Sequence, residues 1–225
     1  MHNKLLLLLP VRTLWAAGLA FCLLIPAMAG AGAGAKTATS NGVTVYASLP
    51  VIRKDFPVPT QDAGILFYLQ RSMNPNTIIY SANLTRDGHF NNSEPVQVYW
   101  RRFNSNGETR ALDNDESIFA FGVQAVPDAK NPQTFWVNIV SYPKRKARVT
   151  LNEKGEPVAF VEMGGRQARL IYAYIQLDEG WLMPKVRHVD VFGQDTKTGD
   201  YLYERVKPSG QDDDDDDKGA RRRGR

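Results

Sequence analysis

Between residues 43 and 208 the chain reads as a series of short runs in which apolar and polar side chains tend to alternate. A period of two residues is typical of β-strands that bury one face, and β-branched and aromatic residues are frequent in these runs. The runs that predict strands are 43–47, 65–69, 77–80, 96–100, 135–140, 147–151, 158–161, 168–177, 186–192 and 201–206. The pattern therefore predicts an all-β domain.

Residues that favour turns separate these runs. Turns are predicted at Asn74-Pro75-Asn76, Asp87-Gly88, Asn106-Gly107, Lys154-Gly155, Gly164-Gly165, Glu179-Gly180 and Thr198-Gly199. Short links of this kind join neighbouring antiparallel strands, so the part from Phe135 to Val206 is expected to form a meander.

One segment has the signature of a short helix. Asp113 to Glu116 can cap its N-terminus, Ile118, Phe119 and Phe121 would give it an apolar face, and Gly122 would end it. Because long sheets protect their edges by closing or by stacking, we expect a mainly antiparallel meander β-barrel or β-sandwich with this one short helix.

The first 29 residues have the pattern of a secretory signal peptide. Lys4 and Arg12 precede an apolar stretch, and Ala27-Met28-Ala29 is a small-x-small cleavage site. The alternatives are a retained membrane anchor, which Arg12 interrupts, and a lipoprotein signal at Cys22, which bulky Phe21 disfavours. We expect cleavage after Ala29 and a periplasmic or secreted protein, with a membrane contact only through an uncleaved signal.

Composition divides the remainder into three parts. Residues 30–42 are rich in glycine and alanine and predict a flexible linker, residues 43–208 a single β domain, and residues 209–225 a disordered tail with six adjacent aspartates followed by arginines. The only cysteine is Cys22, so the mature chain would be free of cysteine and would fold without a disulfide.

Charge argues against one class of partner. The formal net charge is only +4 over 225 residues, and nucleic-acid binding needs a broad basic field, so no nucleic acid is expected. The basic group Lys144, Arg145, Lys146 and Arg148 is interpreted as a solvated turn between two strands.

Several segments, in order along the chain, match a known family. They are 66–72 (LFYLQRS), 76–80 (NTIIY) with Asn83, 95–100 (PVQVYW), 119–123 (FAFGV), and 184–193 (PKVRHVDVFG) with Thr198-Gly199. Together they resemble the domain of unknown function 4833 family over about residues 64–208. The resemblance implies an exported bacterial domain, and it brings neither an established activity nor catalytic residues.

Candidate catalytic groups are few. His188 and Asp190 lie two residues apart in one predicted strand, so both side chains face the same side, while Val189 and Val191 face the core. They are the candidate pair for acid–base chemistry, and the alternative is a solvated polar face. The sequence contains no G-x-S-x-G motif.

The segment from Asn83 to Glu94 has the oxygen spacing of a calcium loop. Asn83, Thr85, Asp87 and Asn91 occupy its first, third, fifth and ninth positions, and Glu94 its twelfth. Only two of these residues are anionic and strands flank both ends, so the alternative is an Asp-Gly turn.

We expect no cofactor.

Aromatic residues are numerous in the predicted strands. They could line a cavity for a small apolar ligand, or they could fill the core. The candidates are Tyr68, Tyr80, Tyr99, Trp100, Trp136, Tyr172 and Tyr174. The leading hypothesis is a non-enzymatic binding or interaction module for a small apolar ligand or an envelope component. The alternatives are a cell-envelope hydrolase or transferase that uses His188 and nearby carboxylates, and a structural cell-surface protein.

Overall fold

The computed structural model describes residues 36–50, 54–60, 62–178 and 185–207. The predicted signal peptide, the C-terminal tail and the predicted Glu179-Gly180 turn lie outside these residues. No helix within the described part of the chain is long and apolar enough to span a bilayer.

The described residues form thirteen strands and two very short helical turns, which confirms the all-β class. The strands are β1 (Lys36–Ser40), β2 (Val43–Tyr46), β3 (Ile65–Arg71), β4 (Asn74–Ala82), β5 (Val96–Arg102), β6 (Glu108–Ala111), β7 (Val123–Pro127), β8 (Phe135–Ile139), β9 (Ala147–Leu151), β10 (Pro157–Met163), β11 (Arg166–Asp178), β12 (Lys185–Asp195) and β13 (Tyr201–Val206). The helical turns are η1 (Phe103–Ser105) and η2 (Glu116–Ala120).

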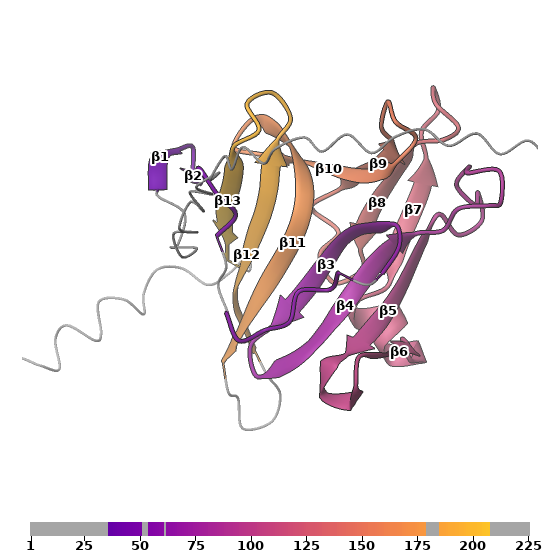
Figure 1. The fold of residues 1–225 in the computed structure, drawn as a ribbon, viewed down its shortest axis with the longest axis horizontal. Helices are drawn as coiled ribbons and strands as arrows, with labels where there is room; N and C mark the ends of the chain where they lie inside the picture. Colours follow the sequence, from indigo (N-terminus) through magenta and orange to yellow (C-terminus); the bar gives the residue numbers. More distant parts are fainter. Residues whose placement is uncertain (1–35, 51–53, 61, 179–184, 208–225) are drawn as a thin grey trace, which may run out of the picture. The chain divides into compact units, whose positions relative to one another are not determined.

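The sheet forks at β11, its longest strand (Figure 1). On one edge β11 pairs with β12 along most of its length. On the other edge its first residues, 166–169, pair antiparallel with β10, and its later residues, 172–175, pair parallel with β3. A register shift between Leu170 and Tyr172 lies at the fork. One branch continues as β10-β9-β8-β7 and the other as β3-β4-β5-β6.

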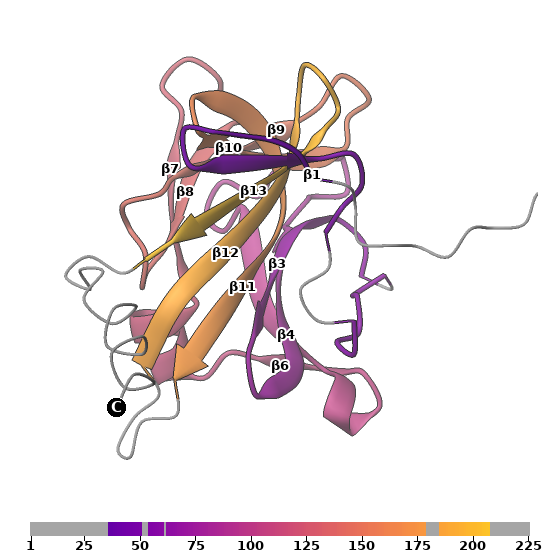
Figure 2. The same ribbon diagram turned by 90° about the vertical axis from the view of Figure 1, so that its left-hand side faces the viewer.

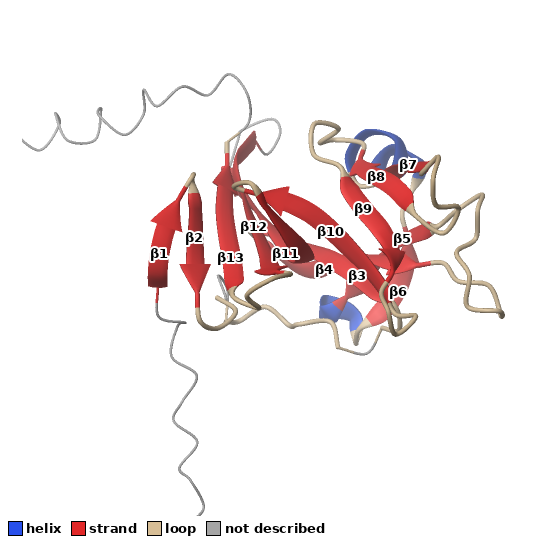
Figure 3. Ribbon diagram, turned by 90° about the horizontal axis from the view of Figure 1, so that it is seen from above, coloured by secondary structure: helices blue, strands red, loops and turns tan. Residues whose placement is uncertain are grey.

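The two branches face each other across the main core. Phe67, Tyr80 and Trp100 come from β3, β4 and β5, and Val137 and Val149 from β8 and β9, all within one buried cluster. Seen from above, β8 and β9 lie on the opposite side of this space from β3 and β4 (Figure 3). No ladder joins β7 to β5 or β6 within the described residues, so the sheet stays open. Of the two predicted architectures, the fold is therefore sandwich-like and not a closed barrel.

The meander predicted from Phe135 to Val206 is confirmed, since β8 to β13 pair in chain order. Beyond β13 the sheet continues into β2 and β1. Figure 2 shows β13, β12, β11 and β3 side by side, and their outer face carries a second buried cluster of mainly aromatic residues.

Five aromatic rings form a continuous ladder across that outer face. The ring-centroid distances are 6.3 Å for Tyr46–Tyr203, 5.2 Å for Tyr203–Phe192, 4.2 Å for Phe192–Tyr172 and 5.2 Å for Tyr172–Tyr68. Cross-strand pairs of this kind stabilise sheets. The segment before β3 covers the ladder, because the Tyr172 hydroxyl donates to the Pro50 carbonyl at 2.7 Å and Phe56 packs on Tyr174.

Strands β6 and β7 lie outside the predicted runs, and three further local features differ from the sequence predictions. The first is β1, which lies within the segment expected to be a linker. Asn41 and Gly42 have φ values of 50° and 73°, which a two-residue type I′ hairpin requires, and this turn brings β1 against β2. This tight hairpin therefore extends the sheet into the segment that was expected to be a linker.

The second difference is the turn predicted at Asn74-Pro75-Asn76, which is wrong by two residues. These residues begin β4, and the turn consists of Ser72 and Met73, with Met73 at φ 69°. Proline is tolerated there because it lies at the start of the strand.

The third difference concerns the predicted helix, which is one π-helical turn, η2. Its start is as predicted: the Glu116 amide donates to the Asp113 carboxylate at 2.8 Å, and the Asp113 amide donates to the Glu116 carboxylate at 3.0 Å. The predicted apolar face is wrong, because Ile118 is 56% exposed and Phe119 is 73% exposed. Only Phe121 packs inward, edge-on against Trp100.

Candidate functional site

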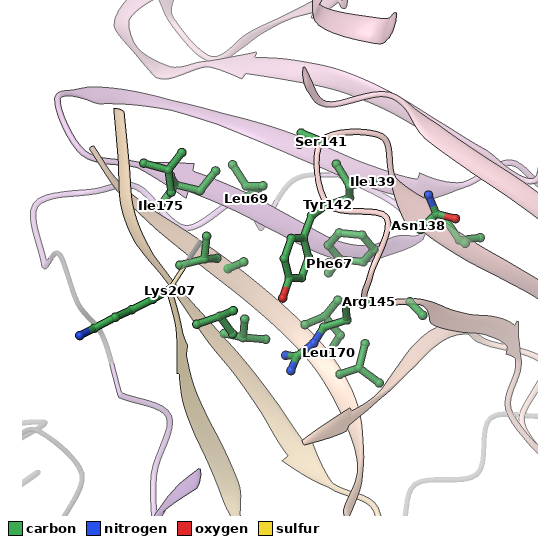
Figure 4. A pocket seen from close by; sticks show the side chains of 18 residues that line it. Phe67, Leu69, Asn138, Ile139, Ser141, Tyr142, Arg145, Leu170, Ile175 and Lys207 are labelled. Carbon is green, nitrogen blue, oxygen red and sulfur yellow. The ribbon is translucent and has the colours of Figure 1, made fainter. Parts of the chain in front are cut away.

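A cavity of about 250 Å³ lies between the two branches of the sheet, next to the fork (Figure 4). Its lining is almost wholly apolar and comes from β3, β8 to β13 and the β8–β9 loop. The lining residues are Phe67, Leu69, Val137, Asn138, Ile139, Ser141, Tyr142, Arg145, Ala147, Val161, Leu170, Ala173, Ile175, Val186, Val189, Val191, Val206 and Lys207.

The alternation of β12 explains how the cavity forms. Val189 and Val191 point toward the cavity, whereas His188, Asp190 and Phe192 point to the outer face. At the fork β11 leaves β10 and turns to β3, and the cavity lies beside this point, with Ala173 of β11 and Val137 of β8 both in its lining.

The β8–β9 loop contributes one charged side chain, Arg145, to the lining of the cavity. Its Nη2 donates to Oε1 of Glu204 on β13 at 2.7 Å, and both side chains are about four-fifths buried. Figure 4 shows the guanidinium and the Tyr142 ring projecting into the cavity, whereas the Lys207 ammonium points away from it. The site thus combines apolar walls with one internally paired charge.

The structure also brings His188 and Asp190 together, on the outer face of the sheet. Their Nε2 and Oδ2 atoms are 3.5 Å apart, and the Asp190 side chain is only 1% exposed. Arg205 holds this carboxylate with two hydrogen bonds, of 2.7 and 3.1 Å, and the Tyr203 hydroxyl donates to it at 2.8 Å. A solvated polar face does not describe this pair, because Asp190 is buried within a hydrogen-bonded cluster.

Burial dominates the electrostatics of this cluster. It lowers the pKa of His188, against the opposing effect of the Asp190 charge. It also raises the pKa of Tyr203 to about 12, and the hydrogen bond to Asp190 acts in the same direction. With its oxygens occupied by Arg205 and Tyr203, Asp190 is positioned to hold β12 to β13.

The predicted calcium loop forms a compact excursion between β4 and β5. The Asn91 amide donates to the Asn83 carbonyl at 2.8 Å, the Thr85 hydroxyl donates to the His89 carbonyl, and the Asn91 carboxamide oxygen accepts from Ser93. Asp87 and Glu94 are exposed. Among the described residues, no group of three or more His, Cys, Asp or Glu side chains is arranged to hold a metal ion.

The seven aromatic candidates lie around the two cores, and none of them is among the residues that line the cavity. Tyr80 and Trp100 are buried in the main core, while Tyr68, Tyr172 and Tyr174 belong to the outer cluster. The Tyr99 hydroxyl donates to the Asp62 carboxylate at 2.9 Å. The Trp136 side chain is 40% exposed, and its indole N–H donates to the Asp128 carboxylate.

Sequence reasoning missed Arg145 as a site residue. The sequence predicts a solvated turn for Lys144, Arg145, Lys146 and Arg148, and it gives no sign that one of these four basic side chains turns inward. Of the other lining residues, strand alternation predicts Val189 and Val191 as core positions. Pairing across the fork, which only the three-dimensional structure shows, turns those core positions into cavity walls.

Comparison with known proteins identifies the family. The family model of a domain of unknown function, DUF4833, matches residues 67–205, from β3 to β13. No curated protein and no solved structure matches the chain. Since the match covers more than half of the chain and includes the fork, the protein belongs to the DUF4833 family.

Proposed function

We propose that this domain is a non-enzymatic binding module that holds a small apolar ligand in the cavity beside the fork. The observation that carries the proposal is the cavity itself. At about 250 Å³ it exceeds the roughly 150 Å³ of an engineered apolar cavity that binds benzene. Its walls are aliphatic and aromatic, with one charged pair, as is usual for small-molecule sites.

The cavity walls belong to the folded framework. Phe67, Leu69, Val137 and Val161 are each less than 5% exposed, and they are held by strands that pair on both sides. Walls that are fixed before binding reduce the ordering cost of association, and a pocket of this kind favours binding without a large rearrangement.

Toluene is a suitable first probe, because it fits the volume and offers no hydrogen bond. We expect toluene to raise the free energy of unfolding, by about 2.7 kcal/mol at 100 times its dissociation constant. The measurement is urea unfolding with and without toluene. Ala173→Leu should fill the cavity, so this variant should lose the toluene effect.

The matched control is the same substitution on the exposed strand β6, Ala111→Leu, which should keep the toluene effect of the wild type. A wild-type protein whose unfolding is unchanged at saturating toluene would contradict the proposal.

We also propose that the domain acts outside the cytoplasm, as a periplasmic or secreted protein. The support is the sequence pattern of residues 1–29, with its basic start, apolar middle and Ala27-Met28-Ala29 site. Expression of the full chain in a bacterial host, followed by N-terminal sequencing, should give a chain that begins at Gly30. Recovery of chains that begin at Met1 would contradict export with cleavage.

A further inference from the structure

Arg145, which lines the cavity, carries an unsatisfied hydrogen-bond donor. Arg145 uses Nη2 to bind Oε1 of Glu204, but its Nη1 is buried and has no hydrogen-bond partner among the described residues. Oε2 of Glu204 is buried and unpaired in the same way. Buried polar atoms without partners are rare and costly, and each calls for an explanation.

The position of Arg145 points to a ligand as that explanation. Its side chain is part of the cavity lining, and Figure 4 shows the guanidinium among apolar side chains that include Leu170 and Phe67. An oxygen atom of a bound molecule could accept from Nη1 there, while the rest of that molecule contacts the apolar walls. The ligand would thus be apolar with a single polar end.

The charges of Arg145 and Glu204 determine which kind of ligand oxygen can bind to Nη1. Glu204 already neutralises Arg145 at 2.7 Å, so a carboxylate in the cavity would bring a second negative charge close to that of Glu204. A buried charge without a partner of its own is strongly disfavoured. A hydroxyl adds no charge and accepts from Nη1, so it satisfies this donor without placing a second negative charge beside Glu204.

We infer that the ligand of this cavity is an uncharged alcohol, with an apolar body in the cavity and its hydroxyl on Arg145. This inference rests on the proposed function and narrows it to one class of ligand. Arg145 sets the specificity, and Glu204 excludes anionic ligands.

Three ring compounds of nearly the same shape test the inference: toluene, benzyl alcohol and benzoate. For the wild-type protein at neutral pH, we expect benzyl alcohol to bind about ten times more tightly than toluene, the effect of one hydrogen bond to a charged group. Benzoate should bind most weakly. Dissociation constants from calorimetric titration provide the comparison.

Two variants test whether the Arg145–Glu204 pair causes the preference for benzyl alcohol. In Arg145→Met/Glu204→Gln both charges are absent, and toluene should bind more tightly than benzyl alcohol because the hydroxyl loses its partner. In Glu204→Gln the charge of Arg145 is no longer neutralised, and benzoate should become the best of the three ligands.

The outcomes separate the two proposals. If none of the compounds binds the wild-type protein, the proposed function fails. If toluene binds but benzyl alcohol binds no more tightly, the cavity is a purely apolar site and this inference alone is overturned. Retention of the preference for alcohol in the double variant would also overturn it.

Discussion

At the scale of single residues, the cluster around Asp190 shows how a polar group can be placed in a buried position. Arg205, Tyr203 and His188 surround the carboxylate, and each of them comes from β12 or β13. The i, i+2 spacing predicted that His188 and Asp190 share a face. It could not predict Arg205 and Tyr203, because their contact depends on the register between two strands.

His188 makes stability depend on pH. Burial lowers its pKa in the folded state, so below about 6.5, the usual value for histidine, the unfolded chain binds more protons than the folded one. The free energy of unfolding should therefore fall as the pH decreases from 7 toward 5. Urea unfolding across this range measures the slope, which His188→Gln should reduce.

The control for this experiment is His89→Gln, which changes an exposed histidine in the β4–β5 loop. It should keep the wild-type slope. Equal slopes for the wild type and His188→Gln would show that the burial of His188 has no effect on folding.

At the scale of elements, β11 organises the fold, because it joins the two branches and carries the centre of the aromatic ladder. Tyr172 stacks on Phe192 from β12 and on Tyr68 from β3, with interplanar angles of 8° and 7°. Strand alternation predicts β11 as the longest run, at 168–177, but predicts β12 only over 186–192. It could not predict the parallel partner β3, since no local signal marks a pairing between strands so far apart in sequence.

Two substitutions at Tyr172 separate the effect of the ring from that of the hydroxyl. Tyr172→Ala should cost about 3–5 kcal/mol of stability, as is typical when a large buried aromatic side chain is truncated. Tyr172→Phe keeps the ring and removes the hydroxyl that donates to Pro50, so it should cost about 1 kcal/mol. Urea unfolding of both variants gives these values, and similar losses would contradict a central role for the ring.

At the scale of the whole molecule, the sequence predicted the class of fold and its meander, but not the fork. Alternation indicates which side chains share a face, as with Val189 and Val191, but it does not say which strand lies opposite. The Asn41-Gly42 turn was readable as a hairpin signal, although the small residues around it suggested a linker. Arg145 could not be predicted, because one inward-facing arginine among four basic residues depends on Glu204, which lies on β13.

The order of the strands also determines when the protein can fold. In the finished sheet Tyr46 pairs with Tyr201 and Tyr68 with Tyr172, so strands near the beginning of the chain find their partners near its end. Contacts between such distant segments form slowly. During synthesis β2 cannot pair with β13 until residues 201–206 have left the ribosome, so this part of the sheet is completed late. An unfolded chain is the form in which a polypeptide can be threaded through a narrow channel, so the late pairing of β2 with β13 is compatible with the export proposed above.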